Sequence, residues 1–222
     1  MPVRNALAAA LLPVASACSL SISNAPTHEE ALHVNEPVTE IRVELGASDV
    51  EILAADVTTV DVTAKIKGEK NHLRQEARGG TLLLTIECAE SPCGSHIRAT
   101  VPRAARLAVK TGAGDVALLG TRGATKLETG SGDISAAAFA GSELSAHTGS
   151  GDVNLVVAEP SQRLSIHTGS GDVRLLVPAG KYRVALDTGS GKERVIGIID
   201  DAAAERTIDV DTGSGDVQID GA

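Results

Sequence analysis

The sequence predicts an all-β protein that folds as a single-domain β-solenoid, a stack of short coils of about 20 residues each. Three observations predict this class: one corner motif occurs six times at nearly constant spacing, apolar and polar residues alternate on both sides of it, and aromatic residues are almost absent. A β-sandwich is the alternative, since short regular strands with turn signals are also typical of that class. A sandwich, however, gives no reason for the same corner residues to recur at this spacing.

The corner motif is the string TGSGDV or a close variant of it. Its copies begin at Thr111, Thr129, Thr148, Thr168, Thr188 and Thr212, at intervals of 18, 19, 20, 20 and 24 residues. The string LGASDVEI at Leu45–Ile52 resembles a degenerate seventh copy. Such a period indicates a structural repeat with small insertions.

Each of the six copies contains two glycines at fixed positions, which predict backbone angles that a side chain would penalise. These structural turn glycines are Gly112, Gly114, Gly130, Gly132, Gly149, Gly151, Gly169, Gly171, Gly189, Gly191, Gly213 and Gly215. The Asp after the second glycine is expected to accept hydrogen bonds from turn amides, and the Thr hydroxyl to do likewise on the inner side. The motif is therefore predicted to form the corner of one coil.

The residues on both sides of each corner alternate with period two. Before the corner, Leu144 and Ala146 are predicted to face inward and His147 outward; after it, Val153 and Leu155 face inward. Each repeat is therefore predicted to be strand, tight turn, strand and loop. Stacking the coils at about 4.8 Å places equivalent side chains in columns. The predicted inner columns are Val109, Leu127, Ala146, Ile166, Leu186 and Val210 before the corner, and Val116, Ile134, Val153, Val173 and Val217 after it.

The composition agrees with narrow coils and limits the partners. The chain has 222 residues, 42% of them hydrophobic, with one Phe, one Tyr and no Trp, and its formal net charge is −9. A core of Val, Ile, Leu and Ala suits closely spaced layers. The missing aromatic platforms and the negative charge both disfavour a nucleic-acid partner, and the charge also disfavours attraction to anionic lipid.

The N-terminus has the features of a signal peptide, predicted to be residues 1–17: one Arg, an apolar run and small residues before Cys18. The string ASAC resembles the bacterial lipobox, so Cys18 is predicted to be acylated and to anchor the protein to a membrane. This interpretation places the protein in the bacterial cell envelope, facing the periplasm or the cell surface. Plain secretion after cleavage at the same place is the alternative.

The three cysteines favour the lipid anchor. Cys88 and Cys93, in the string CAESPC, are predicted to form a disulfide, which leaves Cys18 unpaired unless it carries a lipid. A metal or redox site at this pair is disfavoured, because no His pair lies beside it at zinc spacing and the spacing is not that of a redox dithiol. Residues 18–37 are predicted to be the anchor and a flexible spacer. Residues 38–222 are predicted to be the solenoid, with irregular coils over 38–106 and the repeats over 107–222.

A lipoprotein-like signal, then strands, then a run of TGSGDV corners resembles the bacterial putative-adhesin family, whose members are β-strand repeat proteins with a domain of unknown function. The segments VPRAARLAVKTGAGDVALLG and KLETGSGDISA carry the resemblance, which covers residues 40–222. The resemblance implies a β-solenoid associated with the cell envelope. It brings no catalytic residues with it.

Two metal sites are alternatives to a purely structural corner. The corner residues Asp115, Asp133, Asp152, Asp172 and Asp216 are predicted to form an outward column, which a calcium-binding β-roll would use as ligands. Lys192 replaces Asp in the fifth copy and is expected between Asp172 and Asp216, where it would spoil a metal ladder. His147 and His167 occupy equivalent outward positions on adjacent coils and are the candidates for a transition metal. Because turn amides can satisfy the carboxylates, we expect no metal and no cofactor.

The acids form a uniform column instead of a localised pair, and the sequence holds no nucleophile elbow, phosphate loop or zinc motif. A polysaccharide-cleaving solenoid enzyme is therefore the disfavoured alternative. We expect a non-catalytic scaffold or adhesin-like binding module whose partner is a glycan or an envelope protein. The last copy is expected to expose an edge strand, and Asp201–Glu205 are expected to form a protruding loop.

Overall fold

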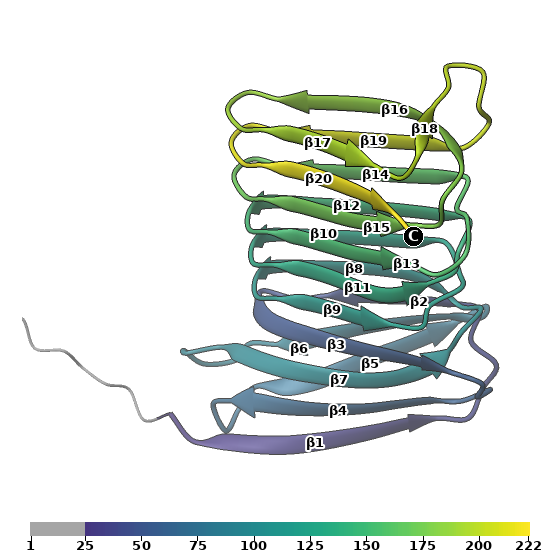
Figure 1. Ribbon diagram of the computed structural model, residues 1–222. Helices are drawn as coiled ribbons and strands as arrows, with labels where there is room; N and C mark the ends of the chain where they lie inside the picture. The colour runs from purple at the N-terminus through teal and green to yellow at the C-terminus, as the bar shows by residue number, and fades with distance from the viewer. Residues whose placement is uncertain (1–24) are drawn as a thin grey trace, which may run out of the picture.

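The computed structural model describes residues 25–222 as strands joined by turns and loops (Figure 1). The strands are β1 (Thr27–Val34), β2 (Glu40–Glu44), β3 (Ala47–Ala55), β4 (Val60–Lys67), β5 (His72–Arg78), β6 (Thr81–Glu87), β7 (Gly94–Pro102), β8 (Arg106–Ala113), β9 (Val116–Leu119), β10 (Thr125–Ser131), β11 (Ile134–Phe139), β12 (Glu143–Ser150), β13 (Val153–Val157), β14 (Arg163–Thr168), β15 (Val173–Val177), β16 (Lys181–Thr188), β17 (Glu193–Ile196), β18 (Ile199–Asp200), β19 (Thr207–Thr212) and β20 (Val217–Gly221). Within this range no helix is long and apolar enough to cross a membrane.

The strands form two faces of one stack. The first face has the order β5, β6, β2, β8, β10, β12, β14, β19, β16, and the second has the order β1, β4, β7, β3, β9, β11, β13, β15, β20, β17. From β6 and β7 onward, neighbouring strands on each face are parallel, whereas β1, β4 and β5 join antiparallel. The predicted β-solenoid is confirmed.

The core lies between the two faces and consists of the predicted columns. The inward residues of both columns are almost completely buried, with the exception of the half-buried Leu186. The two aromatic residues also lie inside, at Phe139 and Tyr182. Alternation with period two therefore gave the inward face of each repeat correctly.

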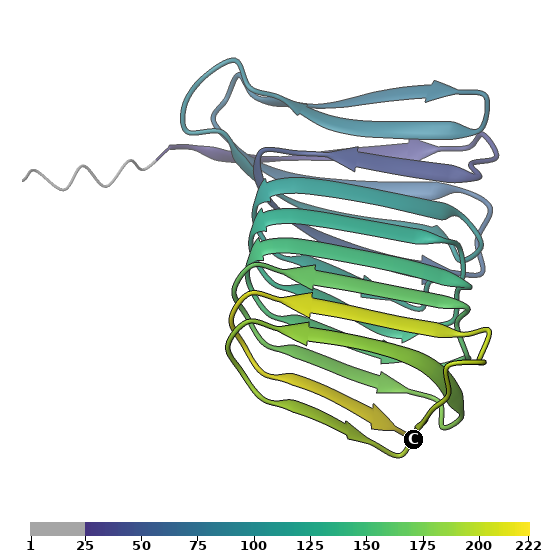
Figure 2. The ribbon, with the colours of Figure 1, turned by 90° about the horizontal axis from the view of Figure 1, so that it is seen from above.

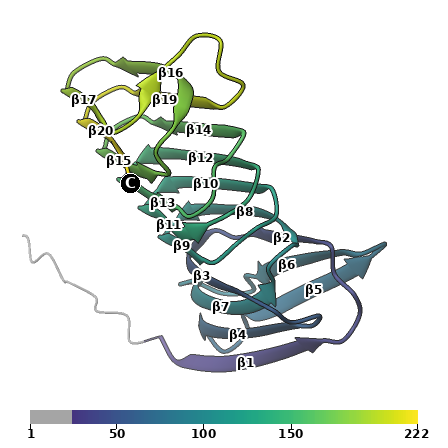
Figure 3. The ribbon, with the colours of Figure 1, turned by 45° about the vertical axis from the view of Figure 1, so that its right-hand side comes forward.

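At the N-terminal end, the order of coils in space differs from their order in the chain. The coil formed by β2 and β3 lies between the coil of β6 and β7 and that of β8 and β9. Figure 3 shows β5 and β6 on one side of this end and β1 and β4 on the other. The predicted flexible spacer over 18–37 was wrong for Thr27–Val34, because these residues form β1 and pair along their whole length with β4. Residues 1–17 and Cys18 lie outside the described residues.

The same rearrangement occurs at the C-terminal end. The last strands, β19 and β20, lie between the coil of β14 and β15 and that of β16 and β17, as the yellow strands between green ones in Figure 2 show. The expectation that the last copy exposes an edge was therefore wrong; the edge is β16 with β17. Lys192 consequently lies at the end of the Asp column and not between Asp172 and Asp216. The loop that contains Asp201–Glu205 protrudes beside β18 (Figure 1), as predicted.

A disulfide between Cys88 and Cys93 closes the loop that joins β6 to β7, which confirms the predicted pairing. The completely buried Asn71 fastens this loop. Its Oδ1 accepts hydrogen bonds from the amides of Ala89 and Glu90 at 2.8 and 2.9 Å. Its Nδ2 lies 2.7 to 3.2 Å from three backbone carbonyl oxygens. One side chain thus substitutes for the corner motif, which this coil lacks.

Candidate functional site

The repeated motif forms the corner that joins the two faces. Thr168 is buried, and its hydroxyl donates a hydrogen bond to the carbonyl oxygen of Gly151 at 3.1 Å. The sequence predicts that this hydroxyl accepts a hydrogen bond from a turn amide. It donates one to the neighbouring coil instead. At Gly171, where φ is +153°, an added Cβ would lie 2.0 Å from the same carbonyl oxygen. The second glycine of each corner is needed because the next coil passes so close.

The corner aspartates connect successive coils. In space the column runs from Asp49, through the five predicted aspartates, to Lys192. The Oδ1 of each Asp accepts a hydrogen bond from the backbone amide of the next residue in the column, at 2.8 to 3.1 Å. Arg174 lies 3.0 Å from the Oδ2 of Asp172. One oxygen of each carboxylate thus has a structural role, and the expectation that the column binds no calcium stays a prediction.

His147 and His167 lie side by side, as their register predicts. Their rings stack in parallel, with centroids 4.8 Å apart and planes at 4° to each other. The Nδ1 of His167 lies 3.0 Å from the Oδ2 of Asp211 on the next strand. Parallel stacked rings direct their nitrogen lone pairs alongside each other and not toward one point. The structure therefore brings the two residues together in a ladder of side chains and not in the geometry of a shared metal site.

Large aliphatic side chains are exposed in a line across the second face. We call Leu53, Leu119, Val156, Leu176 and Ile196 the aliphatic stripe; their exposed fractions lie between 38% and 48%. They come from β3, β9, β13, β15 and β17, and Leu53 opposes Leu119 as Val156 opposes Leu176. On the intervening strands the corresponding positions hold small or acidic residues, Ala137 on β11 and Asp220 on β20.

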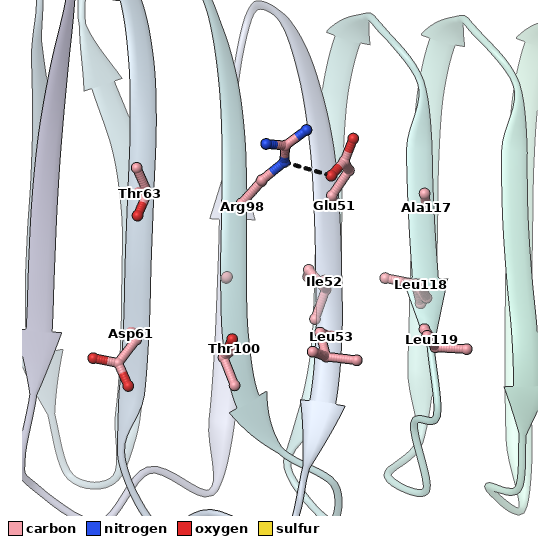
Figure 4. Close-up of a pocket in the computed structure, with 11 residues that line it drawn as sticks. Glu51, Ile52, Leu53, Asp61, Thr63, Arg98, Thr100, Ala117, Leu118 and Leu119 are labelled. Carbon is pink, nitrogen blue, oxygen red and sulfur yellow. Dashed lines mark hydrogen bonds and ion pairs between the residues drawn. The ribbon is translucent and has the colours of Figure 1, made fainter.

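A groove of about 500 Å³ lies at the β3 end of the aliphatic stripe, over β4, β7, β3 and β9 (Figure 4). Leu53 and Leu119 lie side by side on one flank, and the Nε of Arg98 donates to Glu51 at 2.7 Å. This hydrogen bond holds the pKa of Glu51 below its ordinary value. A general acid needs a raised pKa, so the lowered pKa argues against Glu51 in that role.

A second ion pair borders the groove on β4. Asp61, which lines it, is hydrogen bonded to the Nδ1 of His33 on β1. Hydrogen bonds from His33 to Asp61 and Asn35 raise the pKa of this imidazole. Charged side chains of Asp61, Glu51 and Arg98 thus line the groove together with the apolar Leu53 and Leu119.

The fold and its corners define a class of non-helical repeat proteins in which two-strand coils stack in register and one face carries exposed aliphatic side chains. The chain belongs to the Toastrack DUF4097 family, whose model matches residues 91–220. No curated protein matches the chain.

Several solved structures are similar at low sequence identity. A putative cell adhesion protein from Clostridium sporogenes is 12% identical, with a TM-score of 0.46 over 89% of this chain and 100% of that chain. A putative adhesin from Bacteroides fragilis is also 12% identical, with a TM-score of 0.47 over 88% of this chain and 97% of that one. A putative lipid binding protein from Parabacteroides distasonis, again 12% identical, has a TM-score of 0.35 over 87% and 96%.

Two features of the surface were not predicted from the sequence. The aliphatic stripe was visible as pairs of adjacent apolar residues, such as Leu118 with Leu119 and Leu175 with Leu176, which break the alternation with period two. The second feature is a group formed by His28, Glu30 and His72. No local pattern could have found it, because 42 residues separate Glu30 from His72.

Proposed function

We propose that this protein is a non-catalytic binding module of the bacterial cell envelope that contacts a protein partner through the aliphatic stripe. The observation that carries the proposal is the alignment of five exposed aliphatic side chains along one face. At a strand spacing of about 4.8 Å, the stripe from β3 to β17 is about 29 Å long. Exposed apolar patches mark interaction sites in soluble proteins. Here the pairs Leu53 with Leu119 and Val156 with Leu176 form such patches, and Asp220 lies between Leu176 and Ile196.

The surface chemistry favours a protein over a glycan. Sugar rings commonly stack on aromatic side chains, but Phe139 and Tyr182, the chain's only residues of these types, are 0% and 1% exposed. Aliphatic side chains flanked by ion pairs match the apolar centre and charged rim of a protein interface. The formal net charge of −9 favours a basic partner.

The proposed lipid anchor at Cys18 would orient the stripe. The first strand, β1, begins nine positions after Cys18 and lies at the N-terminal end of the stack. An anchored molecule would hold this end next to the membrane, with the coils stacking away from it. The stripe would then extend outward from the groove toward β17, where a partner can reach it.

Site-specific photo-crosslinking in the producing bacterium tests this function. A photo-reactive residue at Leu119 or Leu176 is expected to give the same discrete protein adduct, whereas the matched position Asp209, exposed on the first face, gives none. Leu119→Asp is expected to abolish the adduct formed from position 176 without changing the circular dichroism spectrum. Equal adducts from all three positions, or none from the stripe, would refute the proposal.

A further inference from the structure

Two histidines and a glutamate meet at the N-terminal end of the stack, away from the aliphatic stripe. His28 and Glu30 occupy alternate positions of β1, so their side chains share one face of the strand. His72 is the first residue of β5. Since β1 is the edge strand of one face and β5 the edge strand of the other, these side chains connect the two faces where the stack ends.

The three side chains bring their ligand atoms together. The Oε1 of Glu30 lies 3.3 Å from the Nε2 of His28 and 2.6 Å from the Nδ1 of His72. All three ligand atoms lie within 4.8 Å of one another. One oxygen of a single carboxylate thus faces two imidazole nitrogens that come from different elements.

The carboxylate of Glu30 is held in place by the backbone. Its other oxygen, Oε2, accepts a hydrogen bond from the backbone amide of Leu73 at 2.8 Å. A backbone bond that orients a ligating carboxylate is the outer-shell support found at metal sites.

The arrangement fits a tetrahedral zinc ion. Zinc takes imidazole nitrogens and carboxylate oxygens at about 2.0–2.2 Å, which places tetrahedral ligand atoms about 3.3 Å apart. The separation between His28 and Glu30 already has this value, and the one between Glu30 and His72 needs to widen by less than about 1 Å. Two His and one Glu form a known zinc donor set that leaves a fourth position for water or a partner's ligand.

Hydrogen bonding within the group leaves His28 incompletely satisfied. Its Nδ1 is buried and has no hydrogen-bond partner among the residues that the structure describes. Buried polar atoms in native proteins nearly always have a partner, so the ring is not held there for hydrogen bonding on both sides. Nε2 is thus the ring nitrogen that faces Glu30, and it is the one that would ligate the metal.

We propose that His28, Glu30 and His72 bind one Zn²⁺ ion, which ties the edge strand of one face to the edge strand of the other. Within the described residues, β1 pairs with β4 alone, and Glu30 is its contact with β5, so the metal reinforces the attachment of the first strand to the other face. This clamp closes the N-terminal end of the stack. It is independent of the function proposed for the aliphatic stripe.

Isothermal titration of Zn²⁺ into the metal-stripped, untagged full chain tests the site. We expect one ion per chain, at least tenfold weaker binding in His72→Ala, and a rise in the thermal unfolding midpoint with zinc in the wild type that His72→Ala lacks. The matched control is the double variant His147→Ala with His167→Ala, which removes the stacked pair and should leave uptake unchanged. Cys18→Ser is a second control, because a free thiol could also bind zinc.

His72 is exposed at the start of its strand, so its truncation is expected to leave the fold intact. If circular dichroism shows that His72→Ala does not fold, the same zinc titration is made with His28→Gln, which removes a different ligand. Saturable uptake that either folded variant weakens supports the clamp. No uptake, or uptake equal in wild type and variants, would overturn it.

Discussion

Two substitutions of one aspartate in the middle of the column distinguish the contribution of its hydrogen bond to stability from that of its charge. The Oδ1 of Asp133 accepts the Asp152 amide at 2.8 Å, and its own amide donates to Asp115 at 2.9 Å. Asp133→Asn keeps an oxygen that can accept this hydrogen bond but removes the negative charge. Two carboxylates about 4.8 Å apart in water repel each other by about 0.9 kcal/mol, and salt lowers this value, so the substitution relieves that repulsion with each neighbouring aspartate. Asp133→Ala removes the acceptor, at a cost of about 1 kcal/mol. We therefore expect Asp133→Asn to be neutral or stabilising by up to about 1 kcal/mol, and Asp133→Ala to be destabilising by about 1 kcal/mol.

Thermal unfolding followed by circular dichroism checks this order, since 1 kcal/mol shifts the midpoint of a chain of this size by about 2–4 °C. The measurement is made with chelator and again with calcium. If Asp133→Asn destabilised the protein as much as Asp133→Ala does, the negative charge itself would be needed and the structural explanation of the column would fail. Calcium that stabilises the wild type but not Asp133→Asn would establish the calcium alternative.

Three further substitutions probe the corner, the disulfide loop and an ion pair. Gly171→Ala is expected to lower the free energy of unfolding by about 3 kcal/mol, because its Cβ would lie 2.0 Å from the neighbouring coil's carbonyl oxygen; Ser170→Ala, exposed beside it, should have no effect in the same urea titration. Asn71→Ala is expected to cost about 3 kcal/mol in urea unfolding, since it leaves buried loop groups without partners; an equally stable variant would contradict the role of Asn71. Because the folded pKa of His33 is raised by Asp61, its stabilisation is fully present below about pH 6.5 and is lost as the pH rises through the raised value. Urea midpoints of wild type and His33→Gln should therefore differ at about pH 5.5 and converge at high pH; a difference that grew with pH would contradict this sign.

The regular part of the fold could be predicted because its information is local. The glycines of each corner and the alternation around them act within one repeat, and parallel stacking then aligns equivalent residues such as Val153 and Val173. The Asp and Thr positions followed from turn chemistry, although the direction of the Thr168 hydrogen bond did not. A hydroxyl can donate or accept, and only the neighbouring coil's carbonyl decides which.

The ends of the stack and the surface sites could not be predicted, because they depend on contacts between distant segments. Sequential stacking is the natural assumption for repeats, and nothing local to Thr212 indicates that its coil inserts beside Thr168. The pairing of β1 with β4 likewise needs partners in space, which the polar segment before Pro37 does not reveal. The candidate zinc site combines both difficulties, since Glu30 and His72 meet only when the two faces close.

The departure of the fifth copy from the motif follows from its place in space. Its corner reads TGSGKE, and the coil of β16 and β17 is the outermost one, so the far side of this coil faces solvent. Glu193 keeps the register of an inward residue opposite Val217, yet it is exposed because no further coil covers it. Charged residues at Lys192, Glu193 and Arg194 discourage another strand from pairing with this edge. The last copy in the sequence, by contrast, keeps the full TGSGDV motif, because its coil packs against a neighbouring coil on each side. A repeat that breaks its own pattern thus marks the end of the stack more reliably than the end of the chain does.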